Sequence, residues 1–134
     1  MESKVWDPLR RKEVSLTPEE RVRQWFIAEL LETSGVPSHM MMSEVSLALG
    51  GKQFRADIVV YDRTGAPLMV VECKKPEVPL DGKVTDQALR YGLSLGVRYI
   101  VVTNGLGTFV FEKDGGGFSP LGKLPSWEEM LCRP

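Results

Sequence analysis

Two short apolar runs, 58–61 and 68–71, constrain the fold of this chain more than any other feature of its sequence. The first reads Ile-Val-Val-Tyr, the second reads Leu-Met-Val-Val, and Asp-Arg-Thr-Gly-Ala-Pro separates them. β-Branched residues favour strands, and a polar segment with glycine and proline favours a turn. We therefore predict an antiparallel β-hairpin with strands at about 54–61 and 68–73.

Charged residues at one end of this hairpin predict a metal-dependent site. Glu72 and Lys74 follow the second run two residues apart, so they share one face of a strand while Cys73 points to the other. Asp57 opens the first run, and the hairpin can bring it beside Glu72. Two carboxylates and an ammonium at the end of an apolar hairpin are costly without a partner or a metal. An ordinary surface salt bridge is the alternative for these three residues.

The cation that this residue set favours is Mg²⁺ or Mn²⁺. The carboxylates of Asp57 and Glu72 are hard ligands, and Mg²⁺ keeps several waters and accepts phosphate oxygens in its other positions. Such an ion polarises a phosphodiester and lowers the pKa of a bound water. Lys74 can orient that water or neutralise charge on the phosphate. The three residues therefore predict metal-assisted phosphodiester hydrolysis.

The elements around the hairpin predict an α/β fold with a central mixed β-sheet. Thr17 is a good N-cap before Pro18, and Val22, Trp25, Phe26 and Leu30 then recur at helical spacing until a Ser-Gly-Val-Pro stop at 34–37. The other elements expected from periodicity are a strand at 43–49, a helix at about 84–95, and strands at 99–102 and 108–112. The resulting core order is helix, three strands, helix and strand.

The length of the chain, 134 residues, is enough for one hydrophobic core. We expect a single domain over 1–134, with its core at about 17–113 and a C-terminal extension at about 114–134. The run of three glycines at 115–117 is expected to be a loop. In the extension, Ser126 can cap a short helix, and Trp127 would pack that helix onto the domain or contact a partner chain.

In this order and spacing the motifs resemble the PD-(D/E)xK nuclease superfamily, and within it the N-terminal nuclease domain of the restriction subunit of type I restriction-modification systems. The matching segments are 18–23, 55–61, 70–74, 86–91 and 102–105. The resemblance runs from about Trp6 to about Lys113 and implies a restriction-endonuclease-like core. It also implies DNA cleavage, with Asp57 and Glu72 as metal ligands and Lys74 as the catalytic lysine.

Gln87 and Tyr91 match a Gln-x-x-x-Tyr motif found in a subset of that superfamily. Four residues apart, they lie on one face of the predicted second helix. The resemblance implies that they orient Lys74 or contact DNA. On periodicity alone, Tyr91 would be a half-buried core aromatic and Gln87 a surface residue.

A glutamate at the start of the first helix is a candidate auxiliary metal ligand, because many relatives place one there. Glu19 is three and seven residues before Val22 and Phe26, so we expect Glu19, and not Glu20, on the buried stripe of the helix. The alternative is that both glutamates serve only the helix dipole and its cap.

The net charge of −1 predicts weak intrinsic DNA binding, because non-specific affinity rests on phosphate neutralisation by Lys and Arg. The candidates for a local positive patch are Arg55, Lys74, Lys75, Lys83 and Arg90, which could equally be scattered solvated side chains. We expect DNA as the partner, with a homodimer or restriction-complex subunits supplying further affinity. The chain has no Walker-type glycine loop, so ATP-driven translocation is not expected of it by itself.

Other features of the sequence predict a cytoplasmic protein with no membrane segment. Cys73 and Cys132 have no metal-finger spacing, and no apolar stretch reaches signal or transmembrane length. The only histidine, His39, lies in a turn and is expected to be structural or solvated.

Together these features predict a Mg²⁺-dependent endonuclease domain acting on DNA. The alternative from another class is a non-catalytic nucleic-acid-binding or assembly module that retains the nuclease fold, which the small size and modest charge favour. The intact set of Asp57, Glu72 and Lys74 favours the nuclease, because a decayed site usually lacks a member. An α/β domain with a fortuitous salt-bridge cluster is the third possibility.

Overall fold

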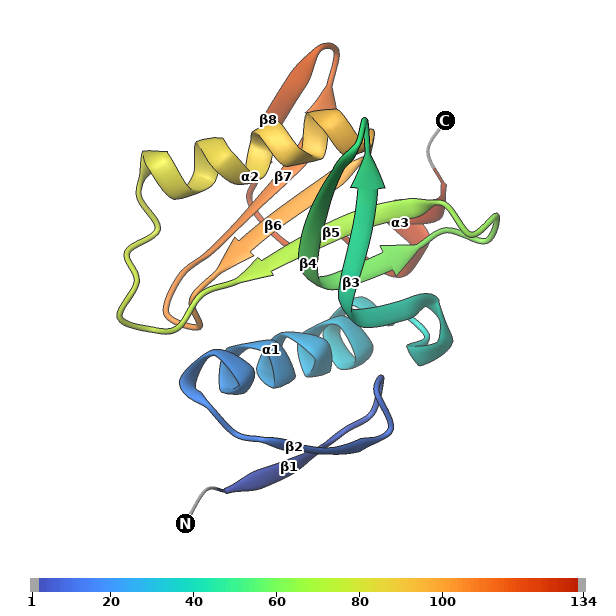
Figure 1. Ribbon diagram of the computed structural model, residues 1–134. Helices are drawn as coiled ribbons and strands as arrows, with labels where there is room; N and C mark the ends of the chain where they lie inside the picture. The colour runs from blue at the N-terminus through green and yellow to red at the C-terminus, as the bar shows by residue number, and fades with distance from the viewer. Residues whose placement is uncertain (1–2, 133–134) are drawn as a thin grey trace.

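A six-stranded mixed β-sheet forms the centre of the molecule (Figure 1). The structure is a computed structural model and describes residues 3–132. The strands, in their order across the sheet, are β3 (Met41–Leu49), β4 (Lys52–Tyr61), β5 (Pro67–Cys73), β6 (Tyr99–Thr103), β7 (Thr108–Asp114) and β8 (Gly117–Leu121). Neighbouring strands are antiparallel except β5 and β6, which are parallel. The predicted hairpin is confirmed as β4 and β5.

The first helix, α1 (Pro18–Glu29), begins where the sequence predicts. The side-chain oxygen of Thr17 accepts a hydrogen bond from the backbone N–H of Glu20 at 3.1 Å, and a proline at the first helical position has no N–H to leave unsatisfied. The chain continues through a π-helical turn, Leu30–Ser34, which periodicity did not predict. Gly35, with φ of +76°, ends the helical segment at the expected stop.

The second helix, α2 (Gly82–Leu95), makes the parallel pairing of β5 and β6 possible. Parallel neighbours need a crossover connection, and α2 supplies it. The Asp81 side chain caps its start by accepting from the backbone N–H of Val84 at 3.1 Å. Gly96, with φ of +69°, ends it.

The two helices cover opposite faces of the sheet, and each face has its own core (Figure 1). Side chains alternate along a strand, so Val71 and Cys73 of β5 lie in the core beneath α1 while Val70 lies in the core beneath α2. Glu72 therefore emerges on the α2 side, at the end of β5 where the apolar face stops.

A two-stranded hairpin, β1 (Lys4–Asp7) and β2 (Lys12–Ser15), packs outside α1, so that α1 lies between this hairpin and the sheet (Figure 1). The sequence analysis did not predict it, because its four-residue strands carry little apolar alternation. Asp7 is completely buried, and its carboxylate accepts from the backbone N–H of Leu9 at 2.8 Å. The connection between the strands presents Arg10 toward α1 and β3.

Segments beyond residue 113 complete the fold. Gly115 and Gly116 form the expected turn, but Gly117 opens β8, which extends the sheet. The short helix α3 (Trp127–Leu131) forms where Ser126 was expected to cap it, with reciprocal bonds of 3.1 Å between Ser126 and Glu129. Met130 of α3 is buried in the core beneath α1.

None of the helices in the described part of the chain is both long and apolar enough to cross a membrane.

The close packing of α2 on the sheet at Gly92 yields a stability prediction. A Cβ at this position would lie 2.4 Å from Cγ1 of Ile100 and 3.1 Å from Cζ of Phe118. We expect Gly92→Ala to lower the free energy of unfolding by about 1–2 kcal/mol, because overpacking outweighs the gain in helix propensity. Urea denaturation measures this.

The matched control is Gly82→Ala in the same helix, where a Cβ meets open space. This substitution should be neutral or slightly stabilising. Equal stability of the two variants would contradict the close packing of α2 on β6.

Candidate active site

The pairing of β4 with β5 brings Asp57 and Glu72 to the same end of the hairpin. Ile58 pairs with Val71 and Val59 with Val70, so the next position outward on each strand is occupied by a carboxylate. The Asp57 Oδ2 atom accepts a hydrogen bond from the backbone N–H of Cys73 at 2.7 Å. The structure thus brings together the two carboxylates that the sequence placed there.

Lys74 lies beside Glu72, as the alternation along β5 predicts. Its Nζ atom is 3.8 Å from Oε2 of Glu72. The backbone N–H of Lys74 donates to the carbonyl of Thr103 at 2.8 Å, which ties this end of the site to β6. The backbone of Lys74 is therefore fixed, and its side chain remains partly exposed.

Glu72 and Lys74 line a small cavity of about 60 Å³ whose other wall is α2. Gln87 and Tyr91 belong to that wall, and Nε2 of Gln87 donates to the Tyr91 hydroxyl at 2.8 Å. The Tyr91 ring also packs on Phe54, with ring centroids 4.6 Å apart. Tyr91 therefore packs through its ring and carries a hydroxyl bonded to Gln87, another residue that lines the cavity.

The surroundings of Glu72 raise the pKa of its carboxyl group. Its side chain is only 21% exposed, and burial, together with the charges of Asp57 and Glu19, raises its pKa to about 7 even though Lys74 acts in the opposite direction. The negative charge of Asp57 is therefore close enough to raise the pKa of Glu72, and Lys74 offsets that effect only in part. A divalent cation would relieve this imbalance.

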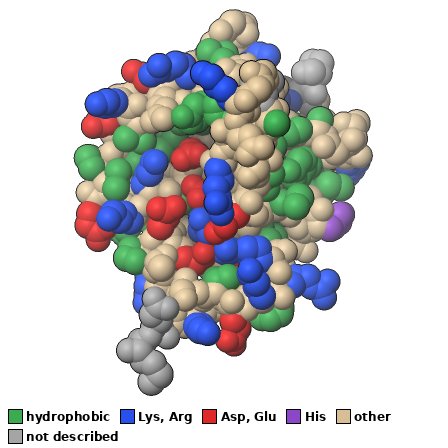
Figure 2. Space-filling view, viewed as in Figure 1, with side chains coloured by type: hydrophobic (Ala, Val, Ile, Leu, Met, Phe, Trp, Pro, Cys, Tyr) green, Lys and Arg blue, Asp and Glu red, His purple; other side chains and the backbone are tan. Residues whose placement is uncertain are grey.

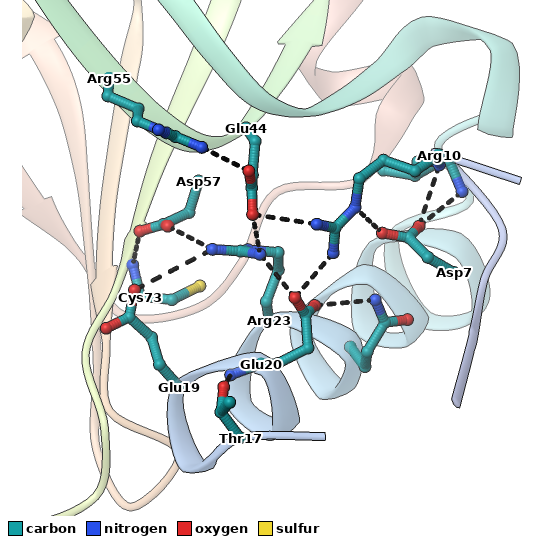
Figure 3. Close-up of polar contacts among 12 residues, drawn as sticks. Asp7, Arg10, Thr17, Glu19, Glu20, Arg23, Glu44, Arg55, Asp57 and Cys73 are labelled. Atoms are coloured by element: carbon teal, nitrogen blue, oxygen red, sulfur yellow. Dashed lines mark hydrogen bonds and ion pairs between the residues drawn. The ribbon is translucent and has the colours of Figure 1, made fainter. Parts of the chain in front are cut away.

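Arg23 on α1 binds the other side of Asp57. Its Nη2 atom donates to Oδ1 of Asp57 at 2.9 Å, and its Nη1 atom donates to Glu20 at 2.7 Å and to Glu44 at 2.9 Å (Figure 3). Burial alone would lower the pKa of the guanidinium, but the hydrogen bond to Asp57 and the neighbouring carboxylates raise it. The sequence analysis did not single out Arg23, although it lies in a segment used for the family resemblance.

Glu44 on β3 is a second site neighbour that the sequence did not predict. It has φ of +52°, in the left-handed region that residues other than glycine rarely adopt. Although burial works against it, hydrogen bonding to Arg55 and the charges of Arg23 and Arg10 hold the pKa of Glu44 below its usual value. No sequence signal marks a strained residue inside a strand.

The prediction that Glu19, and not Glu20, lies on the buried stripe of α1 is wrong. Glu20 is buried and accepts hydrogen bonds from Arg10, Arg23 and Gln24, whereas the side chain of Glu19 is 49% exposed. The cause is the β1–β2 hairpin, which covers the side of α1 that would otherwise face solvent. Glu19 remains close to the site, with Oε1 3.9 Å from Nη2 of Arg23.

The donor set fits a hard divalent cation better than a soft one. Within residues 3–132, no group of three or more His, Cys, Asp or Glu side chains is arranged to hold a metal. Mg²⁺ is bound through one or two carboxylates, with waters and substrate phosphates completing its coordination. Asp57 and Glu72 would therefore be sufficient protein ligands for it. Cys73 does not add a ligand, because it is buried beneath α1 and its pKa is raised by that burial.

Charges of both signs surround the site. Figure 2 shows the molecule from the same side as Figure 1, with acidic side chains gathered near the middle of the face and Lys and Arg side chains interspersed around them. Arg55, one of the candidates for a positive patch, is paired with Glu44. The view does not show a continuous positive surface of the kind that gives strong non-specific DNA binding.

Comparison with known proteins gives both a family and a fold. The sequence profile described as "Type I restriction enzyme R protein N terminus (HSDR_N)" matches residues 18–125. The structure is similar to a fragment assigned as an HsdR subunit of a type I restriction enzyme from Vibrio vulnificus YJ016, with 25% identity, a TM-score of 0.64 and 84% of this chain covered. The chain spans 24% of the length of that fragment.

A second solved structure shares the fold. It is a protein assigned as a nuclease belonging to DUF820, from Anabaena variabilis ATCC 29413, with 13% identity and a TM-score of 0.51. The match covers 90% of this chain and 77% of that protein. No curated protein matches the chain. The two structural likenesses confirm the predicted α/β nuclease-like fold.

The raised pKa of Glu72 predicts that replacing this residue changes the stability of the protein by an amount that depends on pH. The folded state holds the proton of Glu72 up to about pH 7 and the unfolded state only to about 4.5, so ionisation of this group makes the protein less stable as pH rises through that window. Glutamine mimics the protonated carboxyl. We expect Glu72→Gln to raise the free energy of unfolding by up to about 3 kcal/mol at pH 8 and by less than about 1 kcal/mol at pH 5.

Urea denaturation of both proteins at the two pH values, with a chelator present, measures this difference. An equal effect of the substitution at pH 5 and pH 8 would contradict a raised pKa for Glu72.

Proposed function

Because the chain belongs to the family of type I restriction enzyme R protein N termini, we propose that it is a Mg²⁺- or Mn²⁺-dependent endonuclease domain that hydrolyses DNA phosphodiester bonds. The observation that carries the proposal is the arrangement of Asp57, Glu72 and Lys74 where the pairing of β4 with β5 ends. Two adjacent carboxylates, one of them with a raised pKa, and a nearby ammonium suit a charged substrate that arrives with a cation.

Asp57 and Glu72 would hold the cation in this proposal. When bound, a divalent cation supplies a Lewis acid for the phosphoryl group and a nucleophilic water near neutral pH. Asp57 is already held by the backbone N–H of Cys73, so it is fixed before any ligand arrives. Glu72 must give up its proton to serve as a ligand, which makes cation binding pH-dependent below about pH 7.

Lys74 acts on the substrate side of the proposed site. Its ammonium lies on the same face of β5 as Glu72 and lines the same cavity. From there it orients the attacking water or neutralises the charge that develops on the phosphate. Gln87 and Tyr91 form the opposite wall and are proposed to orient Lys74 or to contact the DNA strand.

DNA binding by this chain is proposed to be weak and to depend on partners. The mixed charges around the site and the net charge of −1 favour low affinity for phosphates. Other subunits of a restriction complex, or a second copy of this chain, would supply the remaining affinity. A second copy would also provide the second site that a double-strand break requires. The proposed substrate implies a cytoplasmic location.

A non-catalytic assembly module with the same fold is the second candidate. The ion pair between Asp57 and Arg23 favours it, because this pair balances Asp57 without any metal. Glu72 argues against it, since an unbalanced half-buried carboxylate has no structural use.

Cleavage of supercoiled and linear DNA tests the nuclease proposal. We expect nicking or linearisation that needs Mg²⁺ or Mn²⁺. The rate should fall at least about 100-fold in Asp57→Ala, which removes a proposed ligand of the cation, and in Lys74→Ala, which removes the ammonium beside the reacting phosphate. Lys113→Ala is the control for Lys74→Ala: it removes an exposed lysine at the end of β7 that is far from the site, and it should retain activity.

If cleavage is absent from all four proteins, metal binding separates the two candidates. Mn²⁺ bound by the wild type and lost in Asp57→Ala would point to a missing partner or another substrate. Failure of the wild type to bind Mn²⁺ would favour the assembly module.

The two roles of Tyr91 can be separated by a pair of substitutions. Tyr91→Phe keeps the ring that packs on Phe54 and removes only the hydroxyl that accepts from Gln87. We expect a roughly 10-fold lower cleavage rate with little change in thermal stability, because the substitution removes a hydroxyl bonded to Gln87 in the wall of the cavity and keeps the ring contact with Phe54. Tyr91→Ala should lower both. Full activity of Tyr91→Phe would restrict Tyr91 to packing.

A further inference from the structure

Arg23 lies at the centre of a buried charge network that ends at the proposed metal ligand (Figure 3). Only 8% of its side chain is exposed, and its two terminal nitrogens bind three carboxylates from three different elements. These are Glu20 of α1, Glu44 of β3 and Asp57 of β4. Such a junction fixes the orientation of each carboxylate relative to the others.

Both oxygens of Asp57 are engaged as a result. Oδ2 accepts from the backbone N–H of Cys73 at 2.7 Å, and Oδ1 accepts from Arg23 at 2.9 Å. A carboxylate held at both oxygens cannot rotate freely, yet each oxygen keeps a lone pair for another partner. The plane of the Asp57 carboxylate is therefore set before a cation binds.

Arg10 of the N-terminal hairpin holds Arg23 indirectly. It donates to the same oxygen of Glu20 at 2.7 Å and to the same oxygen of Glu44 at 2.9 Å that Arg23 uses. The buried carboxylate of Asp7 in turn binds Arg10. The hairpin is thus connected to Asp57 through two arginines that share two glutamates.

A guanidinium beside a metal ligand has two opposing effects. Its charge repels a cation, whereas its hydrogen bonds orient the ligand. In the network as a whole, the charges of Arg10, Arg23 and Arg55 are offset by those of Asp7, Glu20 and Glu44, so the net repulsion of a cation is small. The orientation of Asp57 depends on Arg23 directly. Orientation is therefore the larger effect.

We propose that Arg23 is a positioning residue for the metal site: it orients Asp57 for cation binding, and Arg10 holds Arg23 in place by sharing Glu20 and Glu44. The inference rests on the proposed function, because it requires a cation at Asp57. It adds to that function a dependence of metal affinity on the N-terminal hairpin.

Titration of the metal-free protein with Mn²⁺ alone tests the proposal, with calorimetry and the loss of the free Mn²⁺ electron paramagnetic resonance signal as readouts. We expect Arg23→Gln to weaken Mn²⁺ binding by about 10-fold or more, as loss of a partner that orients a ligand does. Arg23→Lys keeps the charge but not the fork that reaches three carboxylates, so it should also bind more weakly than the wild type.

Arg10→Gln examines the indirect part of the network. It should weaken Mn²⁺ binding by a few fold, and its effect should shrink when Arg23 is already glutamine, because the two residues act through one another. Arg21→Gln is the matched control: Arg21 is exposed on the same helix, and its removal should leave Mn²⁺ affinity unchanged. Circular dichroism confirms that each variant is folded. If Arg23→Gln does not fold, Arg23→Lys and Arg10→Gln provide the test.

The outcomes separate this proposal from the proposed function. Weaker Mn²⁺ binding by the folded Arg23 variants, with binding abolished in Asp57→Asn, supports both. A second outcome is that the wild type binds Mn²⁺, Asp57→Asn does not, and the Arg23 variants bind it as tightly as the wild type or more tightly. This outcome overturns the positioning role and leaves the metal site in place. Absence of Mn²⁺ binding by the wild type overturns the metal site and the positioning role together.

Discussion

Antiparallel pairing of β4 with β5 is the interaction on which the rest of the structure depends. It buries the central valines and isoleucine of both strands between the two cores, and it ends where Asp57 and Glu72 meet. The parallel pairing of β5 with β6 then requires a crossover, which places α2 over the same end of β5. The charged site therefore lies where the apolar pairing of β4 with β5 ends and side chains leave the core.

The charges at these strand ends divide between the two faces of the sheet. On the α1 side, arginines neutralise the carboxylates of Glu20, Glu44 and Asp57, and removal of one partner from such a buried pair typically costs about 3–5 kcal/mol. On the α2 side, Lys74 only partly balances Glu72, whose pKa stays high. Of the two residues proposed to hold the cation, Asp57 is thus paired with an arginine, whereas the charge of Glu72 is only partly offset.

Local sequence signals account for most of the elements and for the pairing of the site residues. The Thr17 cap, the glycine stops and the alternation along β5 depend on residues close in sequence, and the structure follows them. The proximity of Asp57, Glu72 and Lys74 could be predicted from the sequence for the same reason, because a hairpin joins them. The π-helical turn, the β1–β2 hairpin and the left-handed Glu44 have no such local signal. Glu44 is bound by Arg10 of the hairpin and Arg23 of α1, which reach it only in the folded chain.

Sequence by itself determined which residues form the β4–β5 hairpin and which charged residues stand at its end, because strand periodicity and turn chemistry act over a few residues. Tertiary structure alone decided which glutamate of α1 is buried. The helical stripe favoured Glu19, but packing of the distant Arg10 against α1 buries Glu20 instead. The environment of Asp57 was decided in the same way, because Arg23 and Glu44 reach it from elements that only the folded sheet brings together.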